Sequence, residues 1–254
     1  MADNYFTEAH EKWIECRRGR FTASEISKLF KTGRREMTEE ELEARPKGPK
    51  GGLLDKRTTV EVMFGEGALS YIEKKANELT STLSKEEKEE SLSELRQMEY
   101  GKNNEMFGVQ EFTKVTKLQV IYHGVACPQF YELNEFAGGS PDGDVIGESA
   151  ALEMKCPYNG QIHMRRLRIK TIEEFKEKYF DDYCQCQMNM YVMKKDFCYY
   201  CSYDPRKMNH KARLKIFKIP ADAGWVAEFE ARFDAALEIL REMLDSYDKT
   251  LFVK

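Results

Sequence analysis

The sequence predicts an α/β protein with a central mixed β-sheet flanked by helices. Helical patterns dominate its first part, and after about residue 117 the apolar period changes to that of strands. Short segments rich in β-branched and aromatic residues then alternate with longer stretches of helical character. Chains that combine the two kinds of element in this way place helices on the faces of a sheet.

The N-terminal elements are expected to be mostly helical. Residues 5–30 carry apolar side chains at helical spacing. Residues 31–57 break the pattern, because a basic loop rich in Pro and Gly interrupts them. An amphipathic helix is expected over 58–79, and the charged segment 80–97 is either a loop or an exposed helix.

The remaining elements complete the sheet and its helical cover. Strands are expected at 118–122, 142–146, 151–156, 197–203 and 213–219. Helices are expected at about 101–116, 161–178, 180–193 and 225–244.

Composition narrows the class of protein. A chain of 254 residues with 41% hydrophobic content is able to bury a real core. No apolar stretch is long enough for a membrane span, and the N-terminus has neither the basic start nor the apolar centre of a signal peptide. Seven cysteines, an odd number, fit a reducing compartment better than a disulfide framework. We therefore expect a cytoplasmic protein.

The charge is unevenly distributed along the chain, although the net charge is only −4. Residues 11–35 hold eight Lys and Arg against three acids, and residues 161–218 hold fourteen against seven. From residue 219 onward, eight acids face four bases. A phosphate-binding surface needs such local basic excess, although ordinary solvated faces produce charge runs too.

Three charged side chains near the middle of the chain indicate a catalytic site. Glu153 and Lys155 are two apart in a predicted strand, so they project from the same face. A turn in 147–149 brings the preceding strand, and with it Asp142, beside them. Two carboxylates suit Mg²⁺, with Mn²⁺ as a substitute, and the lysine is placed to orient or help deprotonate a bound water. This set fits metal-assisted hydrolysis of a phosphodiester by one or two ions.

The same residues resemble the PD-(D/E)xK nuclease superfamily, with its restriction-endonuclease-like core. The wider context is similar to the lambda-exonuclease branch, the YqaJ-type viral recombinases. The matching stretches, in chain order, are Trp13 with 17–24, Tyr100–Glu105, Ser140–Gly143, Leu152–Pro157 and Gln187–Tyr191. The resemblance implies one nuclease domain over 1–254, with a family-variable insertion at about 31–98.

The resemblance also implies roles for individual residues. Glu105 and the main-chain carbonyl of Met154 would complete the metal site of Asp142 and Glu153. Gln187 would lie beside that site, with Tyr191 supporting the same wall. The 5′-phosphate of a DNA end would be bound by Arg17, Ser24 and Ser140, with Arg18 and Arg20 as alternative arginines.

The activity implied by the resemblance is that of an alkaline-type 5′-to-3′ exodeoxyribonuclease. Such an enzyme digests linear double-stranded DNA from a 5′-phosphate end and leaves 3′ single-stranded tails for phage-type recombination. A homotrimer, a single-strand annealing protein as partner and a bacterial or phage-infected host cell are implied as well, and a membrane partner is not expected. The alternatives are an endonuclease of restriction or repair type on the same core and a catalytically silent DNA-binding scaffold.

Other patterns are interpreted as structural. Cys184-x-Cys186 and Cys198-x-x-Cys201 invite an iron–sulfur interpretation, but they lack a full four-ligand pattern and fit buried thiols. The histidines do not cluster in sequence with the carboxylates and are treated as non-catalytic. A Gly-rich phosphate loop of the ATPase type is missing from the sequence, so an ATP-driven motor is not expected.

Overall fold

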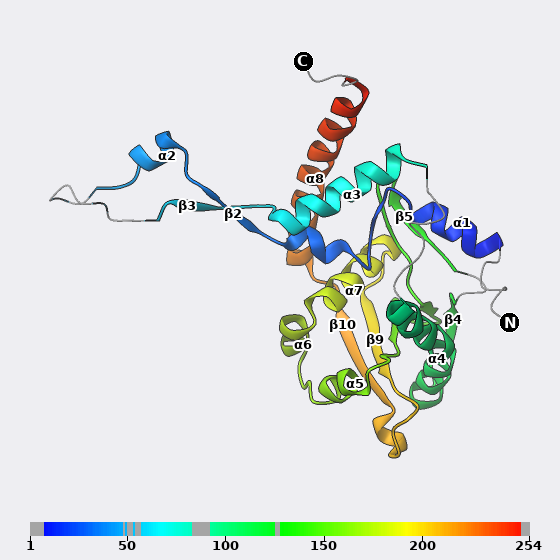
Figure 1. Cartoon of the computed structure of the whole chain (residues 1–254). Helices are drawn as coiled ribbons and strands as arrows, with labels where there is room; N and C mark the ends of the chain where they lie inside the picture. Colours follow the sequence, from blue (N-terminus) through cyan, green and yellow to red (C-terminus); the bar gives the residue numbers. More distant parts are fainter. Residues whose placement is uncertain are drawn as a thin grey trace. The chain divides into compact units, whose positions relative to one another are not determined.

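The computed structural model describes residues 8–47, 49, 53, 57–82, 92–124 and 128–249 (Figure 1). Contacts divide the chain into two compact units, and the first combines Met1–Ser27 with Asn77–Glu228. The second unit combines Lys28–Ala76 with Phe229–Lys254. The predicted insertion at 31–98 overlaps the second unit but does not share its boundaries, and its status as an insertion stays a prediction.

A five-stranded mixed sheet forms the centre of the first unit. Its strands, in the order β10-β9-β8-β7-β4, are Leu214–Pro220, Phe197–Tyr203, Ala150–Lys155, Gly143–Val145 and Val120–Tyr122. Only β8 and β9 pair in parallel, and the other neighbours are antiparallel. A parallel pair needs a long crossover. Here the crossover consists of α5 (Gly160–Leu167), α6 (Ile172–Lys178) and α7 (Phe180–Met193).

Helices cover both faces of this sheet, as the sequence predicts (Figure 1). On one face, α4 (Leu92–Thr116) contributes Phe112 to a buried cluster that includes Leu152 and Met154 of β8. The alternate residues of β8, Glu153 and Lys155, point to the other face, where α7 packs. The apolar and charged side chains of the strand therefore lie on opposite faces of the sheet, as the alternation in its sequence predicts.

A small three-stranded sheet lies in the same unit, and the sequence did not indicate it. Its order is β1 (Phe21–Thr22), β6 (Ala137–Gly139) and β5 (Tyr131–Asn134), with β1 parallel to β6. The prediction of helix throughout 5–30 is therefore wrong. The helix α1 (Glu8–Arg17) ends just before Gly19, whose φ of +69° favours glycine, and only a 3₁₀ turn, η1 (Ile26–Phe30), follows β1.

The second unit also contains strands where none were expected. β2 (Gly33–Glu36) and β3 (Thr59–Val62) form an antiparallel ribbon, and α2 (Glu39–Glu43) begins with a capping box at Thr38. The alternating Thr and Val of β3 explain why the helix predicted over 58–79 begins only at α3 (Glu66–Thr80).

The later elements follow the predictions more closely. α7 and β9 have the expected bounds, and the last helix, α8, covers Ala223–Lys249. The helix expected over 161–178 is divided, because Thr171 caps α6 by accepting a hydrogen bond from the Glu174 amide at 3.1 Å. The helix expected from 101 begins at Leu92, so part of the charged segment 80–97 is helical.

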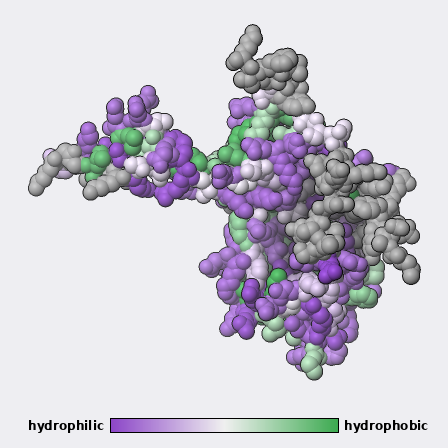
Figure 2. All heavy atoms as spheres, in the orientation of Figure 1, coloured by the Kyte–Doolittle hydropathy of each residue, from purple (hydrophilic) through white to green (hydrophobic). Residues whose placement is uncertain are grey.

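Hydrophilic residues predominate on the described part of the face shown in Figure 2. Within the described residues, none of the helices combines the length and apolar character that a membrane span requires.

We expect Phe112→Ala to lower the free energy of unfolding by about 3–5 kcal/mol, because it leaves a cavity between α4 and the sheet. Phe112 is fully buried, with its ring centroid 5.2 Å from that of Tyr199. Val115→Ala on the same helix, where the side chain is 59% exposed, is the control and should change the value by less than about 0.5 kcal/mol. Equal losses for the two variants, measured by urea denaturation, would contradict this packing.

Candidate active site

The β7–β8 hairpin places Asp142 opposite Glu153, as the sequence predicts. Gly143 pairs with Leu152, and the Asp142 amide donates to the Leu152 carbonyl at 3.0 Å. The Asp142 carboxylate in turn accepts a hydrogen bond from the Met154 amide at 2.6 Å. The turn between the strands contains Gly147, whose φ is +84°. Local hairpin geometry therefore determines where this carboxylate lies.

Glu153 is a nearly inaccessible carboxylate with a full set of donors. Its side chain is 2% exposed, and its Oε1 lies 2.7 Å from Lys155 Nζ. Two amides of α7 also donate to it, from Gln185 Nε2 to Oε1 at 2.8 Å and from Asn189 Nδ2 to Oε2 at 3.0 Å. Gln185 Oε1 accepts from Lys155 Nζ at 2.8 Å. The ion pair is therefore held in one geometry from the opposite helix.

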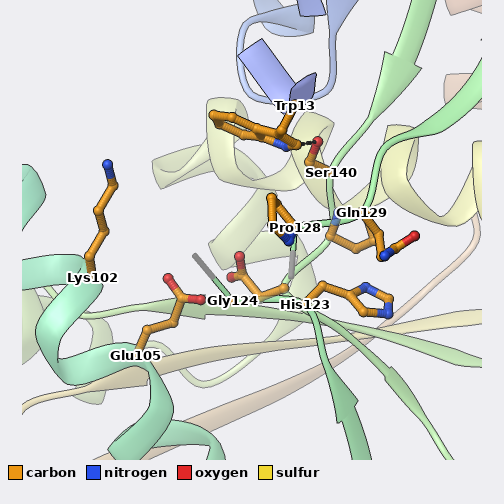
Figure 3. A pocket seen from close by; sticks show the side chains of 10 residues that line it. Trp13, Lys102, Glu105, His123, Gly124, Pro128, Gln129 and Ser140 are labelled. Carbon is orange, nitrogen blue, oxygen red and sulfur yellow. Dashed lines mark hydrogen bonds between the residues drawn. The ribbon is translucent and has the colours of Figure 1, made fainter. Parts of the chain in front are cut away.

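Glu105 reaches the same region from α4. It lines a cavity of about 170 Å³ together with Asp142 (Figure 3). Burial raises the pKa of Glu105 to about 7, although a hydrogen bond with Tyr122 opposes the shift, and the nearby Glu153 raises it further. The predicted third carboxylate is thus electrostatically linked to the other two.

Mutual repulsion among these acids shapes the electrostatics of the site. Burial raises the pKa of Asp142 well above its usual range, and Glu153 and Glu105 raise it further. Burial also raises the pKa of Glu153, although Lys155 acts in the opposite direction. For Lys155, burial favours a lower pKa, but Glu153 and other nearby acids outweigh it and the pKa is raised. The lysine therefore remains an ammonium at neutral pH.

The donor set fits a hard divalent cation. Glu153 and Glu105 raise the pKa of Asp142, and Glu153 raises that of Glu105, so a positive charge among the three carboxylates would relieve this repulsion. The Met154 amide points to Asp142, so the carbonyl on the same edge of β8 points the same way. Among the described residues, no three His, Cys, Asp or Glu side chains already form a metal-binding group. The residues that would hold such a cation are Glu105, Asp142, Glu153 and the Met154 carbonyl.

The prediction that Gln187 lies beside the carboxylates is wrong. Its Nε2 donates to the Pro220 carbonyl and its Oε1 accepts from the Asp222 amide, each at 2.9 Å. With Tyr191 it lines a different cavity, of about 340 Å³. Residues two apart on a helix lie on nearly opposite sides, so Gln185 takes the place expected of Gln187.

Asn189 follows Gln185 by four residues on the same face of α7, where the matched motif would have a tyrosine. Its Oδ1 is buried and has no hydrogen-bond partner in the described part of the chain, and a Cβ on Gly139 would lie 2.6 Å from it. Asn189 thus fits between Glu153 and the backbone of β6. The signal that sequence reasoning missed is the second Gln-x-x-x motif, 185–189, two residues before the one it used.

The structure brings together the three residues predicted to bind the 5′-phosphate. Arg17 donates to Ser24 Oγ at 2.9 Å and to Ser140 Oγ at 3.3 Å. Trp13 Nε1 also donates to Ser140 Oγ, at 2.9 Å, and the Arg17 guanidinium lies 4.5 Å from the centroid of its ring. Pairing of β1 with β6 explains why the two serines lie close together, since Ser24 and Ser140 closely follow these two strands.

The other two candidate arginines, Arg18 and Arg20, bind other partners. Arg18 donates to the Glu78 carbonyl at 2.9 Å and also to the carbonyl of Ser81. Arg20 forms an ion pair with Glu132 at 2.6 Å. Of the three candidates, only Arg17 contacts the two serines.

The cysteines of the described residues fit the structural interpretation. Cys198 and Cys201 are three apart in β9, so they point to opposite faces of the sheet and do not share a metal. Cys184 accepts a hydrogen bond from Trp225 Nε1 at 3.2 Å. All four cysteines of the two motifs are buried and form no disulfide within the described residues.

The histidines take different places. His163 is buried, with one ring nitrogen 2.8 Å from Ser202 Oγ and the other 2.8 Å from the Ala212 carbonyl. His123 lines the cavity of Glu105 and Asp142, next to Gln129 (Figure 3). Its Nδ1 is buried without a hydrogen-bond partner among the described residues.

Comparison with protein families gives one match, the YqaJ-like viral recombinase domain, over residues 12–196. That range contains both the carboxylates and the arginine–serine cluster. The chain belongs to this family. The YqaJ-like domain thus covers most of the chain, including the segment 31–98 that resembles the family least.

Solved structures agree in fold with this YqaJ-like protein. An alkaline exonuclease (LHK-Exo) from Laribacter hongkongensis has a TM-score of 0.65 at 21% identity, over 94% of this chain and 96% of that chain. Its complex with dAMP gives 0.64 at 21% identity and the same coverage. A phage-related exonuclease from Haemophilus somnus 129PT gives 0.61 at 14% identity, over 92% and 98%. No curated protein sequence matches significantly.

We expect Glu105→Gln to change the pH dependence of stability in the metal-free protein. With a pKa of about 7, against an ordinary 4.5, Glu105 binds more protons in the folded than in the unfolded chain between these values. Its contribution to stability is thus present below pH 4.5 and lost as the pH rises through 7. Between pH 4.5 and 8 the wild type should lose roughly 3 kcal/mol relative to the variant.

Urea denaturation in EDTA at a series of pH values measures this difference. Glu99→Gln, at an exposed position of α4, controls for the exchange of carboxylate for amide on this helix. Parallel profiles for the wild type and Glu105→Gln would show that Glu105 is not the titrating group.

Proposed function

We propose that this YqaJ-family protein is a Mg²⁺-dependent 5′-to-3′ exodeoxyribonuclease that acts on linear double-stranded DNA with a 5′-phosphate. One observation carries the proposal. Ser140, which accepts from Arg17, and Asp142, which belongs to the carboxylate group, line the same cavity two residues apart. A terminal phosphate at Arg17 would therefore lie close to the carboxylates that serve the next phosphodiester.

The roles of the carboxylates and the lysine follow from their surroundings. Glu105, Asp142, Glu153 and the Met154 carbonyl would hold one or two Mg²⁺ ions, or Mn²⁺. The bound metal supplies charge stabilisation and a water of lowered pKa. Lys155, protonated and fixed by Glu153 and Gln185, is a hydrogen-bond donor rather than a base, and it orients water and offsets developing negative charge.

The chemistry is consistent with repeated cleavage from one end. Water adds to phosphorus, the bond to the 3′-oxygen breaks, and a 5′-mononucleotide leaves with a 3′-hydroxyl when the attack is on the first phosphodiester. The remaining strand then begins with a 5′-phosphate. A guanidinium matches such a phosphate bidentately, so each turnover regenerates the ligand that Arg17, Ser24 and Ser140 would bind.

Relatives support the same class of activity. Two proteins of similar fold are described as an alkaline exonuclease and a phage-related exonuclease, and the first was also solved with dAMP, a mononucleotide. A role in phage-type recombination, a homotrimer, a single-strand annealing partner and a cytoplasmic location belong to the proposal through the family resemblance.

A time course on linear duplex DNA labelled at either the 5′ or the 3′ end tests the proposal. With Mg²⁺, the 5′ label should appear first as mononucleotide. A covalently closed plasmid should remain intact, and its cleavage would favour an endonuclease. Failure to degrade any DNA under metal titration would favour a silent scaffold.

We expect Lys155→Ala to lower kcat by at least about 100-fold while DNA-end binding persists, because it removes a preorganised donor at the reacting phosphate. Gln185→Ala should lower kcat as well, since it releases Lys155 and Glu153. Gln187→Ala, two residues away, is the matched control and should reduce thermal stability with little change in kcat. The reverse order of the two glutamine variants would refute the reassignment to Gln185.

We expect Arg17→Ala to reduce the preference for 5′-phosphorylated over 5′-hydroxyl duplex by about 10- to 100-fold, because a charge-assisted contact with phosphate is lost. Arg20→Ala, which breaks a surface ion pair with Glu132, is the control and should keep the preference. Competition binding between the two DNA ends measures it. An unchanged preference in Arg17→Ala would mean that the phosphate pocket lies elsewhere.

A further inference from the structure

Lys102 lines the cavity of the candidate active site but has no role in the chemistry described above. It precedes Glu105 by one turn of α4, so the two side chains share a helix face. In Figure 3 the Lys102 side chain extends along the cavity from α4, and Trp13 and Ser140 lie on the other side. Positive groups therefore stand on both walls, Arg17 beside Ser140 and Lys102 beside Glu105.

A phosphodiester in this cavity needs a cation besides Arg17, because carboxylates line the cavity. A phosphodiester that reaches Asp142 and Glu105 meets carboxylates that already repel one another. Lys155 is held by Glu153 and Gln185, and its proposed role is to orient the attacking water and offset the charge that develops during the reaction. Arg17 is occupied by the two serines and is placed for the terminal phosphate. Lys102 is half-buried, and within the described part of the chain its ammonium forms no ion pair. Its positive charge acts to lower the pKa of the nearby Glu105.

We propose that Lys102 binds the scissile phosphate, the first internucleotide phosphate of the 5′-ended strand, from the wall opposite Arg17. This inference rests on the proposed exonuclease function and assigns one of its substrate contacts. Lys102 and Arg17 then divide the substrate between them. Arg17 recognises the terminal 5′-phosphate. Lys102 offsets the negative charge of the phosphodiester to be cut, whether or not the 5′ end is phosphorylated.

The division predicts different behaviour for the two cations. Lys102→Ala should weaken binding of 5′-phosphorylated and 5′-hydroxyl duplexes alike, by about tenfold at low salt, and should keep the preference that Arg17→Ala loses. Since one phosphate contact is removed, the slope of log K against log salt should decrease by roughly one. Lys102→Arg should restore most of the binding. Lys114→Ala, an exposed lysine on the same helix, is the matched control.

A double-mutant cycle between protein and DNA provides the decisive test. The full-length wild type and Lys102→Ala are titrated in EDTA with duplexes that carry a neutral methylphosphonate at either the first or the second linkage of the 5′-ended strand. The neutral first linkage should weaken binding by the wild type and cause little further loss in Lys102→Ala. Additive losses, or coupling at the second linkage alone, would overturn the assignment.

Assays of the same proteins distinguish a failure of the Lys102 assignment from a failure of the proposed exonuclease function. If the wild type binds and degrades linear duplex with Mg²⁺ but the cycle shows no coupling, only the assignment of Lys102 fails. If the wild type neither binds nor degrades DNA ends, the proposed function fails first.

Discussion

The buried ion pair of Glu153 and Lys155 is the constraint on which the rest of the site depends. A carboxylate inside a sheet costs several kcal/mol unless an opposite charge and hydrogen bonds compensate it. Here an ammonium and two amides do so, and the amides come from a helix that is separate in sequence. The crossover through α5, α6 and α7 is therefore tied to the chemistry of β8. Its last helix supplies the groups that make a buried acid tolerable.

A second constraint is the short link between the two sheets of the first unit. β6 ends at Gly139 and β7 begins at Gly143, so Ser140 and Asp142 are held at a fixed spacing between two rigid elements. One residue faces the arginine of α1, and the other accepts from the amide of Met154. The spacing between the proposed phosphate-binding cluster and the carboxylates is consequently set by three residues of backbone. No flexible loop of the described chain has to set it.

The clustered carboxylates illustrate a conflict between stability and function. Burial and mutual repulsion raise the pKa values of Glu105 and Asp142, so the folded protein would be more stable with fewer of these charges. Lys155 already acts against the raised pKa of Asp142, and a divalent cation among the carboxylates would relieve the conflict further. Under the proposed function, this arrangement would allow an acidic protein, with a net charge of −4, to bind a polyanion at one small place.

The sequence alone determined what depends on neighbours along the chain. The alternation in 150–155, the turn at Gly147 and the spacing of Asp142, Glu153 and Lys155 are local, and all are found in the structure. It did not determine the strand at Phe21–Thr22 or the choice of Arg17 over Arg18, because both depend on pairing with β6, more than a hundred residues away.

The rotation of α7 was likewise decided by the tertiary structure. Every residue from Tyr183 to Met190 is buried, so no polar stripe indicates which face meets the sheet, and Gln187 was as plausible as Gln185. Local periodicity specifies what kind of element forms. The face that an element presents depends on packing against distant partners, and only the folded chain brings those together.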